Sequence, residues 1–114
     1  MSTLVADDGR ELGPVELAVT RVARRRGLLG RDQLVGAFVL EPCRSVHTIG
    51  MRFPIDVAYC TGSSSAGFLV CSIRTMRPGR LGAPRLRSRC VIEAEAGFFA
   101  ANGINVDDRL SVRS

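Results

Sequence analysis

Short apolar runs separated by turn-forming residues constrain the fold of this 114-residue chain more than any other feature. Val15, Leu17 and Val19 alternate with polar or small residues, as in a half-buried strand, and the preceding Asp8-Gly9 pair suits a hairpin turn. Other short runs lie at residues 3–6, 37–42, 55–60, 68–76, 89–97 and 108–113. We therefore predict six or seven short strands.

Two segments predict short helices. Thr20 can cap a helical turn through the sequence RVARRRG, and Gly27 can end it. The second segment, FFAANG at 98–103, is too short to be stable alone, so packing of Phe98 or Phe99 must hold it.

The fold class follows from what these elements lack. No long helix connects successive strands, so a parallel sheet is not expected. The sequence therefore predicts a mainly β protein, a small antiparallel pseudo-barrel or sandwich with one or two short helices, formed by residues 1–114 as a single domain. A chain of this length can bury a core without a metal or disulfide.

Composition and short motifs indicate the expected cellular location and the groups that the protein is expected to bind. No apolar run approaches the roughly 20 residues needed to span a bilayer, so no membrane span is expected. The N-terminus has neither a basic start nor an apolar stretch of the secretory type, and the four cysteines form no C-x-x-C pair. We therefore expect reduced thiols, a soluble protein, a cytoplasmic location, no metal and no cofactor.

The net charge of +5 comes from arginine alone among the cations, since lysine is absent. Phosphates of a nucleic acid or an acidic lipid surface are one possible target of such a charge. The chain has one tyrosine and no tryptophan, and base-stacking surfaces usually need exposed aromatic residues. A solvated arginine surface is the better interpretation, with nucleic-acid binding kept as an alternative.

The stretch CRSVHTIGMRFPIDVAYC at 43–60 holds the only histidine. Cys43 as a nucleophile, with His47 and a carboxylate as base and orienter, would suit a small hydrolase or transferase. In an extended chain Cys43 and His47 would stand about 13 Å apart, so contact would need a turn. A structural role, in which His47 and Thr48 bond a loop backbone and Met51 fills the core, is the competing interpretation.

Two carboxylates fall within apolar strands and would need partners if buried. Asp56 could pair with Arg24, Arg26 or Arg52, or it could bond a loop backbone. Glu93 is predicted on the same strand face as Val91 and Glu95, and one of these glutamates could pair with an arginine of the segment RRRGLLGR.

Several ordered motifs resemble one known family. RVARRRGLLGR, SVHTIGMRFPIDVAY, RPGRLG, VIEAEAG and GINVDDRL follow one another at family-like spacing over about residues 14–113. The chain is thereby similar to domain of unknown function 192, an uncharacterised bacterial and archaeal family. The resemblance implies a compact β-rich, barrel-like domain with short helices and no established activity.

The resemblance also assigns individual residues of this chain to family motifs, and at two places the chain differs from the usual motif. Relatives often have tryptophan-methionine-lysine-asparagine-threonine where this chain has His47 and Thr48 before Met51, so a fixed role for His47 is not implied. The usual glycine-aspartate before the last strand is Asp107-Asp108 here. Family-pattern residues chosen for a polar cleft are Arg24, Arg26, His47, Thr48, Met51, Asp56 and Glu93.

These residues lie on three separate segments that a barrel could bring together at one rim. We therefore predict a non-catalytic binding or accessory module whose cleft recognises a small ligand or protein partner. Catalytic residues are not assigned. The sequence does not identify the ligand, the pathway or the oligomeric state.

Overall fold

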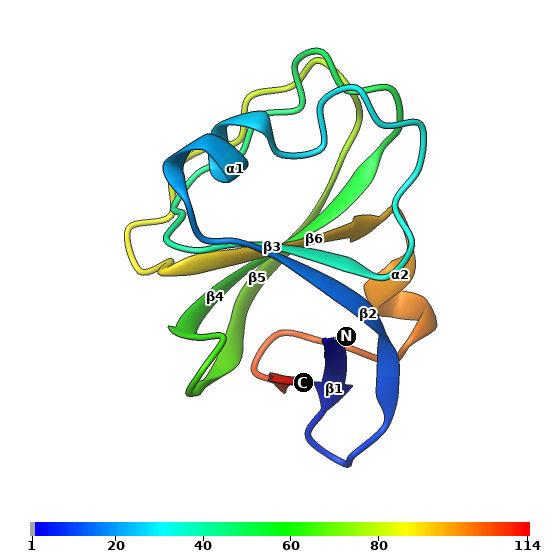
Figure 1. The fold of residues 1–114 in the computed structure, drawn as a ribbon, viewed down its shortest axis with the longest axis vertical. Coiled ribbons are helices and arrows are strands. Elements are labelled where there is room, and N and C mark those ends of the chain that lie inside the picture. The colour runs from blue at the N-terminus through cyan, green and yellow to red at the C-terminus, as the bar shows by residue number, and fades with distance from the viewer. Residues whose placement is uncertain (1) are drawn as a thin grey trace.

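The structure is a computed structural model that describes residues 2–114 and contains seven strands and two short helices (Figure 1). The elements in chain order are β1 (Thr3–Ala6), β2 (Glu11–Ala18), α1 (Arg21–Arg26), β3 (Ala37–Leu40), β4 (Ile55–Ser63), β5 (Gly67–Met76), β6 (Cys90–Glu95), α2 (Phe98–Ala101) and β7 (Arg109–Arg113). The protein is thus mainly β, as the sequence predicts.

The strands close into a barrel in the order β1-β2-β3-β6-β4-β5-β7, and β7 pairs with β1 to complete it. All pairs are antiparallel except β2 with β3, which run parallel. The sequence predicts an antiparallel arrangement because it has no long helix, so this one parallel pair is not expected from it. Here residues 19–36, which include α1, are long enough for the crossover that a parallel pair needs.

The barrel interior is filled from every strand. Its members are apolar or small, and α2 closes one end by inserting Phe99, which is almost fully buried. Phe98 packs against the same cluster at an edge-to-face angle to Phe99. This packing holds a helix of only four residues in place, as the sequence predicts.

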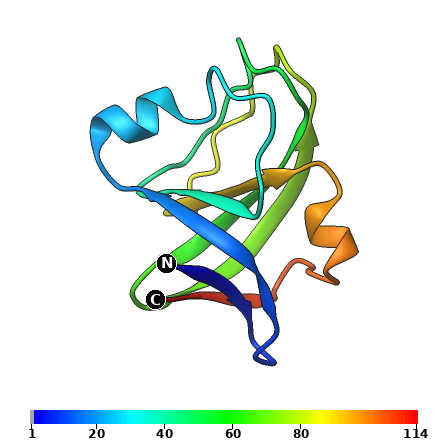
Figure 2. The same cartoon turned by 45° about the vertical axis from the view of Figure 1, so that its right-hand side comes forward.

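A second apolar layer covers the outer face of β3, β6 and β4. It unites outward-facing strand residues such as Phe38, Val57 and Val91 with Leu28 and Met51 from the covering segments. In Figures 1 and 2, α1 and the long loops after it lie together on one side of the barrel, above this face. The outer face of these strands is therefore buried, unlike that of an ordinary barrel.

Strand register decides which side each buried carboxylate faces. On β4 and β6, Val57 lies opposite Glu93 and Asp56 lies opposite Ala94. Because successive side chains alternate across a strand, Glu93 shares the outer layer with Val57, while Asp56 points with Ala94 toward the interior side. The two carboxylates therefore lie on opposite faces of one sheet.

Candidate functional site

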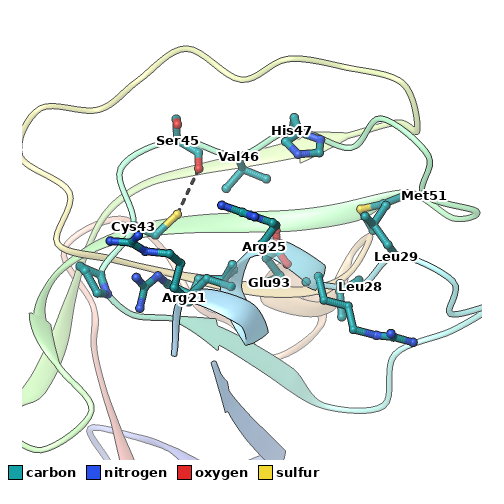
Figure 3. Close-up of a pocket in the computed structure, with 15 residues that line it drawn as sticks. Arg21, Arg25, Leu28, Leu29, Cys43, Ser45, Val46, His47, Met51 and Glu93 are labelled. Atoms are coloured by element: carbon teal, nitrogen blue, oxygen red, sulfur yellow. Dashed lines mark hydrogen bonds between the residues drawn. The ribbon is translucent and has the colours of Figure 1, made fainter. Parts of the chain in front are cut away.

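A cavity of about 350 Å³ lies in the outer layer between α1 and the segment that follows β3. Figure 3 shows Ser45, Val46 and His47 along the top of the cavity, with Arg25, Glu93 and Arg21 below them in this view. The residues that line it are Arg21, Arg24, Arg25, Arg26, Gly27, Leu28, Leu29, Leu40, Pro42, Cys43, Ser45, Val46, His47, Met51 and Glu93. An apolar floor and a basic margin thus surround one carboxyl group.

Glu93 lies on this floor with only 4% of its surface exposed. Among residues 2–114, no hydrogen bond or ion pair involves its carboxyl group. Burial raises the pKa of Glu93 from its ordinary value of 4.5 to about 7, because the charged form loses hydration. At neutral pH the group is therefore poised between a neutral acid and a carboxylate.

The arginines of α1 form the basic margin in two different ways. Thr20 caps the helix by accepting a hydrogen bond from the Ala23 N–H (3.1 Å). Arg24 is half-buried and donates to the backbone oxygens of Val19 (2.7 Å) and Glu41 (3.1 Å), so its guanidinium ties the helix to both neighbouring strands. Three further arginines of the helix are exposed at the cavity: Arg21, Arg25 and Arg26.

The opposite wall is the segment after β3, and buried hydrogen bonds fix it. Thr48 Oγ1 donates to the Arg77 carbonyl oxygen (2.5 Å) and accepts from the Arg80 N–H (2.9 Å). Gly82 passes so close to this segment that a Cβ there would lie 2.7 Å from the Val46 carbonyl oxygen and 2.9 Å from the Tyr59 hydroxyl. The wall is therefore held by the loop before β6.

Cys43 and His47 both line the cavity, but they do not form a nucleophile–base pair. The Cys43 thiol donates a hydrogen bond to the Ser45 carbonyl oxygen at 3.1 Å. The backbone of His47 forms an isolated antiparallel β-bridge with Leu81. Burial raises the pKa of Cys43, and the nearby charge of Glu93 raises it further, which outweighs the lowering by Arg24. The thiol therefore stays protonated at neutral pH, the form that is least nucleophilic.

Five of the seven predicted cleft residues line this one cavity: Arg24, Arg26, His47, Met51 and Glu93. The structure places the other two elsewhere. Thr48 supports the wall from behind, and Asp56 faces the interior side, where it accepts hydrogen bonds from Thr75 Oγ1 (2.7 Å) and the Phe99 N–H (3.3 Å). The cleft therefore forms on the outer face of the sheet, not at a barrel rim.

The arginine pairs considered for the buried carboxylates do not form within residues 2–114, whereas the alternative of a backbone hydrogen bond to Asp56 does, from the Phe99 N–H. Within the described chain, Asp56 bonds a hydroxyl and a backbone N–H, while Arg52 pairs with Asp32 at 2.9 Å. From the segment RRRGLLGR, only Arg31 joins a carboxylate, and its partner is Glu16. Glu93 is left as the buried carboxyl without a partner.

Sequence reasoning missed most of the apolar lining. Leu40 and Val46 carry no chemical signature, and they share the cavity because the segment after β3, which contains Val46, folds back over the sheet that contains Leu40. Leu28 had a signal, since it belongs to the first family motif. The spacing of the arginine run could have found Arg21 and Arg25, which α1 places beside Glu93.

Neither a metal site nor a membrane-spanning helix is found among residues 2–114. No group of three or more histidine, cysteine, aspartate or glutamate side chains is placed to hold a metal ion. No helix in the described chain is long and apolar enough to cross a membrane. The cavity beneath α1 is thus the site with the clearest chemical character.

The fold and cavity define the class of protein: a small closed β-barrel with a pocket on its outer face that is bordered by arginines. The chain belongs to the DUF192 family (Uncharacterized ACR, COG1430), whose model matches residues 3–112. The resemblance seen in the sequence motifs is therefore confirmed. It is the family membership, and no activity, that this match establishes.

Two solved structures share the fold. One, described as a "putative transcription regulator" from Sinorhizobium meliloti 1021, is 23% identical with a TM-score of 0.66 over 96% of this chain and 89% of that one. The other, a protein of unknown function from Novosphingobium aromaticivorans DSM 12444, is 18% identical with a TM-score of 0.72 over 96% and 81%. No curated protein matches the chain.

Proposed function

We propose that this protein is a non-catalytic module that binds a small organic ligand in the cavity beneath α1. The single observation that carries the proposal is Glu93, a buried carboxyl group that faces the cavity and has no partner among residues 2–114. Its carboxyl group opens onto the cavity, so a ligand that enters can make the contact that no side chain of the described residues makes.

The dimensions and lining of the cavity fit this role. Its volume of about 350 Å³ lies at the lower end of the range for small-molecule sites. Leu28, Leu40 and Met51 give an apolar surface, and Glu93 with the helix arginines adds a few polar groups that can orient a ligand. Such a mixture is typical of a binding pocket.

The alternative of a hydrolase or transferase at Cys43 is less well supported. Burial and the charge of Glu93 raise the thiol pKa, and the thiol donates its proton to the Ser45 carbonyl oxygen. Labelling with iodoacetamide across pH 6 to pH 9 tests this alternative. A Cys43 rate that rises only above pH 8 agrees with a binding role, whereas rapid labelling at pH 6 would support a reactive thiolate.

The binding proposal is tested by NMR with isotope-labelled protein and a set of metabolites that includes acids, amines, amino acids and sugar phosphates. Amide shifts should concentrate at Gly27, Leu28, Val46 and Met51, which border the cavity. The variant Ser45→Trp places a large ring at the cavity mouth from an exposed position and should abolish these shifts.

The matched control is Ser111→Trp, which adds the same ring at an exposed position on β7, away from this cavity. This variant should bind as the wild type does. The proposal is contradicted if no compound shifts the cavity amides, or if the shifts persist unchanged in Ser45→Trp.

Nucleic-acid binding is a second candidate, favoured by a different surface. Arg74, Arg77, Arg80 and Arg85 line a separate hollow beside Tyr59, and none of them forms an ion pair within the described chain. The Sinorhizobium meliloti neighbour is described as a regulator. Titration with single- and double-stranded DNA tests this candidate, since phosphate contacts must weaken steeply with salt.

A cytoplasmic location and a protein partner stay predictions. The free thiols of Cys43, Cys60, Cys71 and Cys90 agree with a reducing compartment. Fractionation of cells that express the tagged full chain tests the location, and crosslinking in the same cells tests the partner. Recovery of the chain outside the cytoplasm would contradict the first prediction.

A further inference from the structure

The cavity presents charges of both signs, separated by apolar surface. Arg21 and Arg25 stand at its margin, exposed and outside every ion pair of residues 2–114, while Glu93 lies within. Figure 3 shows Arg25 and Glu93 close together in this view, below the wall formed by Ser45 and Val46. A ligand that fills this space must therefore meet a carboxyl group inside and guanidinium groups at the mouth.

We propose that the ligand is a small zwitterion with an apolar body, a free amino acid or close analogue, whose ammonium group binds Glu93 while its carboxylate binds the α1 arginines. This inference rests on the proposed function, because it names the ligand class of the same cavity. Leu28, Leu40 and Met51 would contact the apolar side chain.

Each simpler ligand leaves one part of the cavity unsatisfied. A plain carboxylic acid would pair with Arg25 but leave Glu93 without a cation. A plain amine would pair with Glu93, but it would meet uncompensated positive charge at the margin. An ammonium group brings both the charge and up to three hydrogen-bond donors to a carboxylate, and the carboxylate of a zwitterion can bind a guanidinium at two points.

The titratable and charged groups that face Glu93 set the pH behaviour. They come from α1, from the wall segment and from β4, and they are Arg21, Arg24, Arg25, Arg26, Cys43, His47 and Tyr59. Burial raises the pKa of Cys43 and of Tyr59, and the negative charge of Glu93 adds a smaller increase, so both stay neutral near pH 7. Glu93→Gln is therefore the variant that isolates the contribution of Glu93 to any pH dependence of ligand binding.

An ammonium ligand requires ionised Glu93, so its binding must strengthen with pH. Because burial raises the pKa of Glu93 to about 7, the ionised fraction and the affinity should rise about tenfold between pH 6 and pH 8. A ligand that accepted a hydrogen bond from neutral Glu93 would show the opposite trend. The sign of the pH dependence thus separates the two modes.

The test begins with thermal shifts of the full chain in the presence of each common amino acid. The amino acid with the largest shift is then compared by calorimetry with its matched decarboxylated amine and deaminated acid; for L-leucine these are 3-methylbutylamine and 4-methylpentanoate. The zwitterion should bind about tenfold more tightly than either, since each lacks one charge pair.

Variants locate the two contacts. Glu93→Gln should weaken amino-acid binding about tenfold or more and remove its pH dependence, whereas Glu95→Gln, at the exposed end of the same strand, should change neither. Arg25→Ala should weaken the zwitterion and the acid but not the amine. Arg109→Ala on β7 is the control for loss of one positive charge.

Three results would overturn the inference: no amino acid raises the melting temperature, the deaminated acid binds most tightly, or the affinity falls from pH 6 to pH 8. The last two would leave the binding proposal intact, because a ligand would still occupy the cavity. Failure of the binding proposal has a different signature, the absence of any ligand-induced shift that Ser45→Trp removes.

Discussion

Asp56 and Glu93 are both buried carboxylates on adjacent strands, with 3% and 4% of their surfaces exposed, yet their surroundings differ completely. Asp56 accepts hydrogen bonds from Thr75 Oγ1 and from the Phe99 N–H, so it caps α2 from a neighbouring strand. Glu93 faces an open cavity with no partner in the described chain. A one-residue offset between two strands separates a carboxylate whose oxygens are hydrogen-bonded from one that faces the cavity.

The polar residues of the protein can be divided in the same way, by whether their hydrogen-bonding groups have partners. Those whose bonding groups are all used, such as Asp56 and Thr48, hold segments together. Those that remain unpaired at the cavity, such as Glu93 and Arg25, are available to a ligand. Asp56, Thr48 and Glu93 all belong to the residues chosen from the family pattern, so that pattern alone does not distinguish stability from binding.

The largest effect is expected at Asp56. Asp56→Ala removes two hydrogen bonds and leaves the Thr75 hydroxyl and the Phe99 N–H without their acceptor, so stability should fall by about 4 kcal/mol. Urea unfolding followed by circular dichroism measures this loss. Asp32→Ala is the control, since its exposed pair with Arg52 should contribute about 0.5 kcal/mol. Equal losses in both variants would contradict a structural role for Asp56.

The next effect has the opposite sign. Burial raises the pKa of folded Glu93 from 4.5 to about 7, so between these pH values the folded state keeps a proton that the unfolded state has lost. Stability should therefore fall by about 3 kcal/mol as pH rises from 4.5 to 7, and Glu93→Gln should remove this fall. Urea midpoints measured from pH 4.5 to pH 8 test this prediction.

At pH 8 the Glu93→Gln variant is thus expected to be more stable than the wild type, in contrast to Asp56→Ala. Glu95→Gln supplies the control, because Glu95 is exposed on the same strand and should leave the pH profile unchanged. A Glu93→Gln profile that parallels the wild type would show that Glu93 is not the group that titrates.

A smaller loss is expected at Thr48, which supports the cavity wall. Thr48→Val keeps the shape but removes the bonds to the Arg77 carbonyl oxygen and the Arg80 N–H, so stability should fall by about 2 kcal/mol. Thr61→Val, at a less buried position of β4, is the matched control and should have little effect. Hydrogen exchange would show faster opening of residues 43–50 in Thr48→Val only.

The smallest effect is a gain at Asp107. Its φ of 76° lies in the left-handed region that glycine adopts without strain. Asp107→Gly should raise stability by about 1 kcal/mol. Asp108→Gly should instead lower it, since Asp108 Oδ2 accepts a hydrogen bond from the Asn105 N–H at 2.6 Å. Denaturant midpoints of both variants test this contrast.

Much of the fold could be predicted because its determinants are local. The alternation in 55–60 assigns Val57 and Asp56 to opposite faces, and Thr20 caps α1 as its position predicts. The parallel pairing of β2 with β3 could not be predicted, since it depends on where an irregular crossover returns to the sheet.

The site was predicted less well because its contacts are distant in sequence. The partners of Asp56 lie 19 and 43 residues away in the sequence. Nothing in the sequence marks the Thr75 hydroxyl or the Phe99 N–H as a hydrogen-bond donor to this carboxylate. For Glu93, the strand pattern indicates a face shared with Val91 but not that α1 and residues 43–50 cover that face. The burial of Glu93 and its lack of a side-chain partner arise only when α1 and residues 43–50 pack over the outer face of the sheet.

Glu93 is a buried residue whose carboxyl group faces the cavity and has no side-chain partner among residues 2–114. Titration of its side-chain carboxyl carbon by NMR, with the resonance assigned through Glu93→Gln, measures this directly. We predict a pKa of about 7 in the ligand-free protein. A pKa near 4.5 would show that water or a cation already satisfies the group, and it would contradict the account.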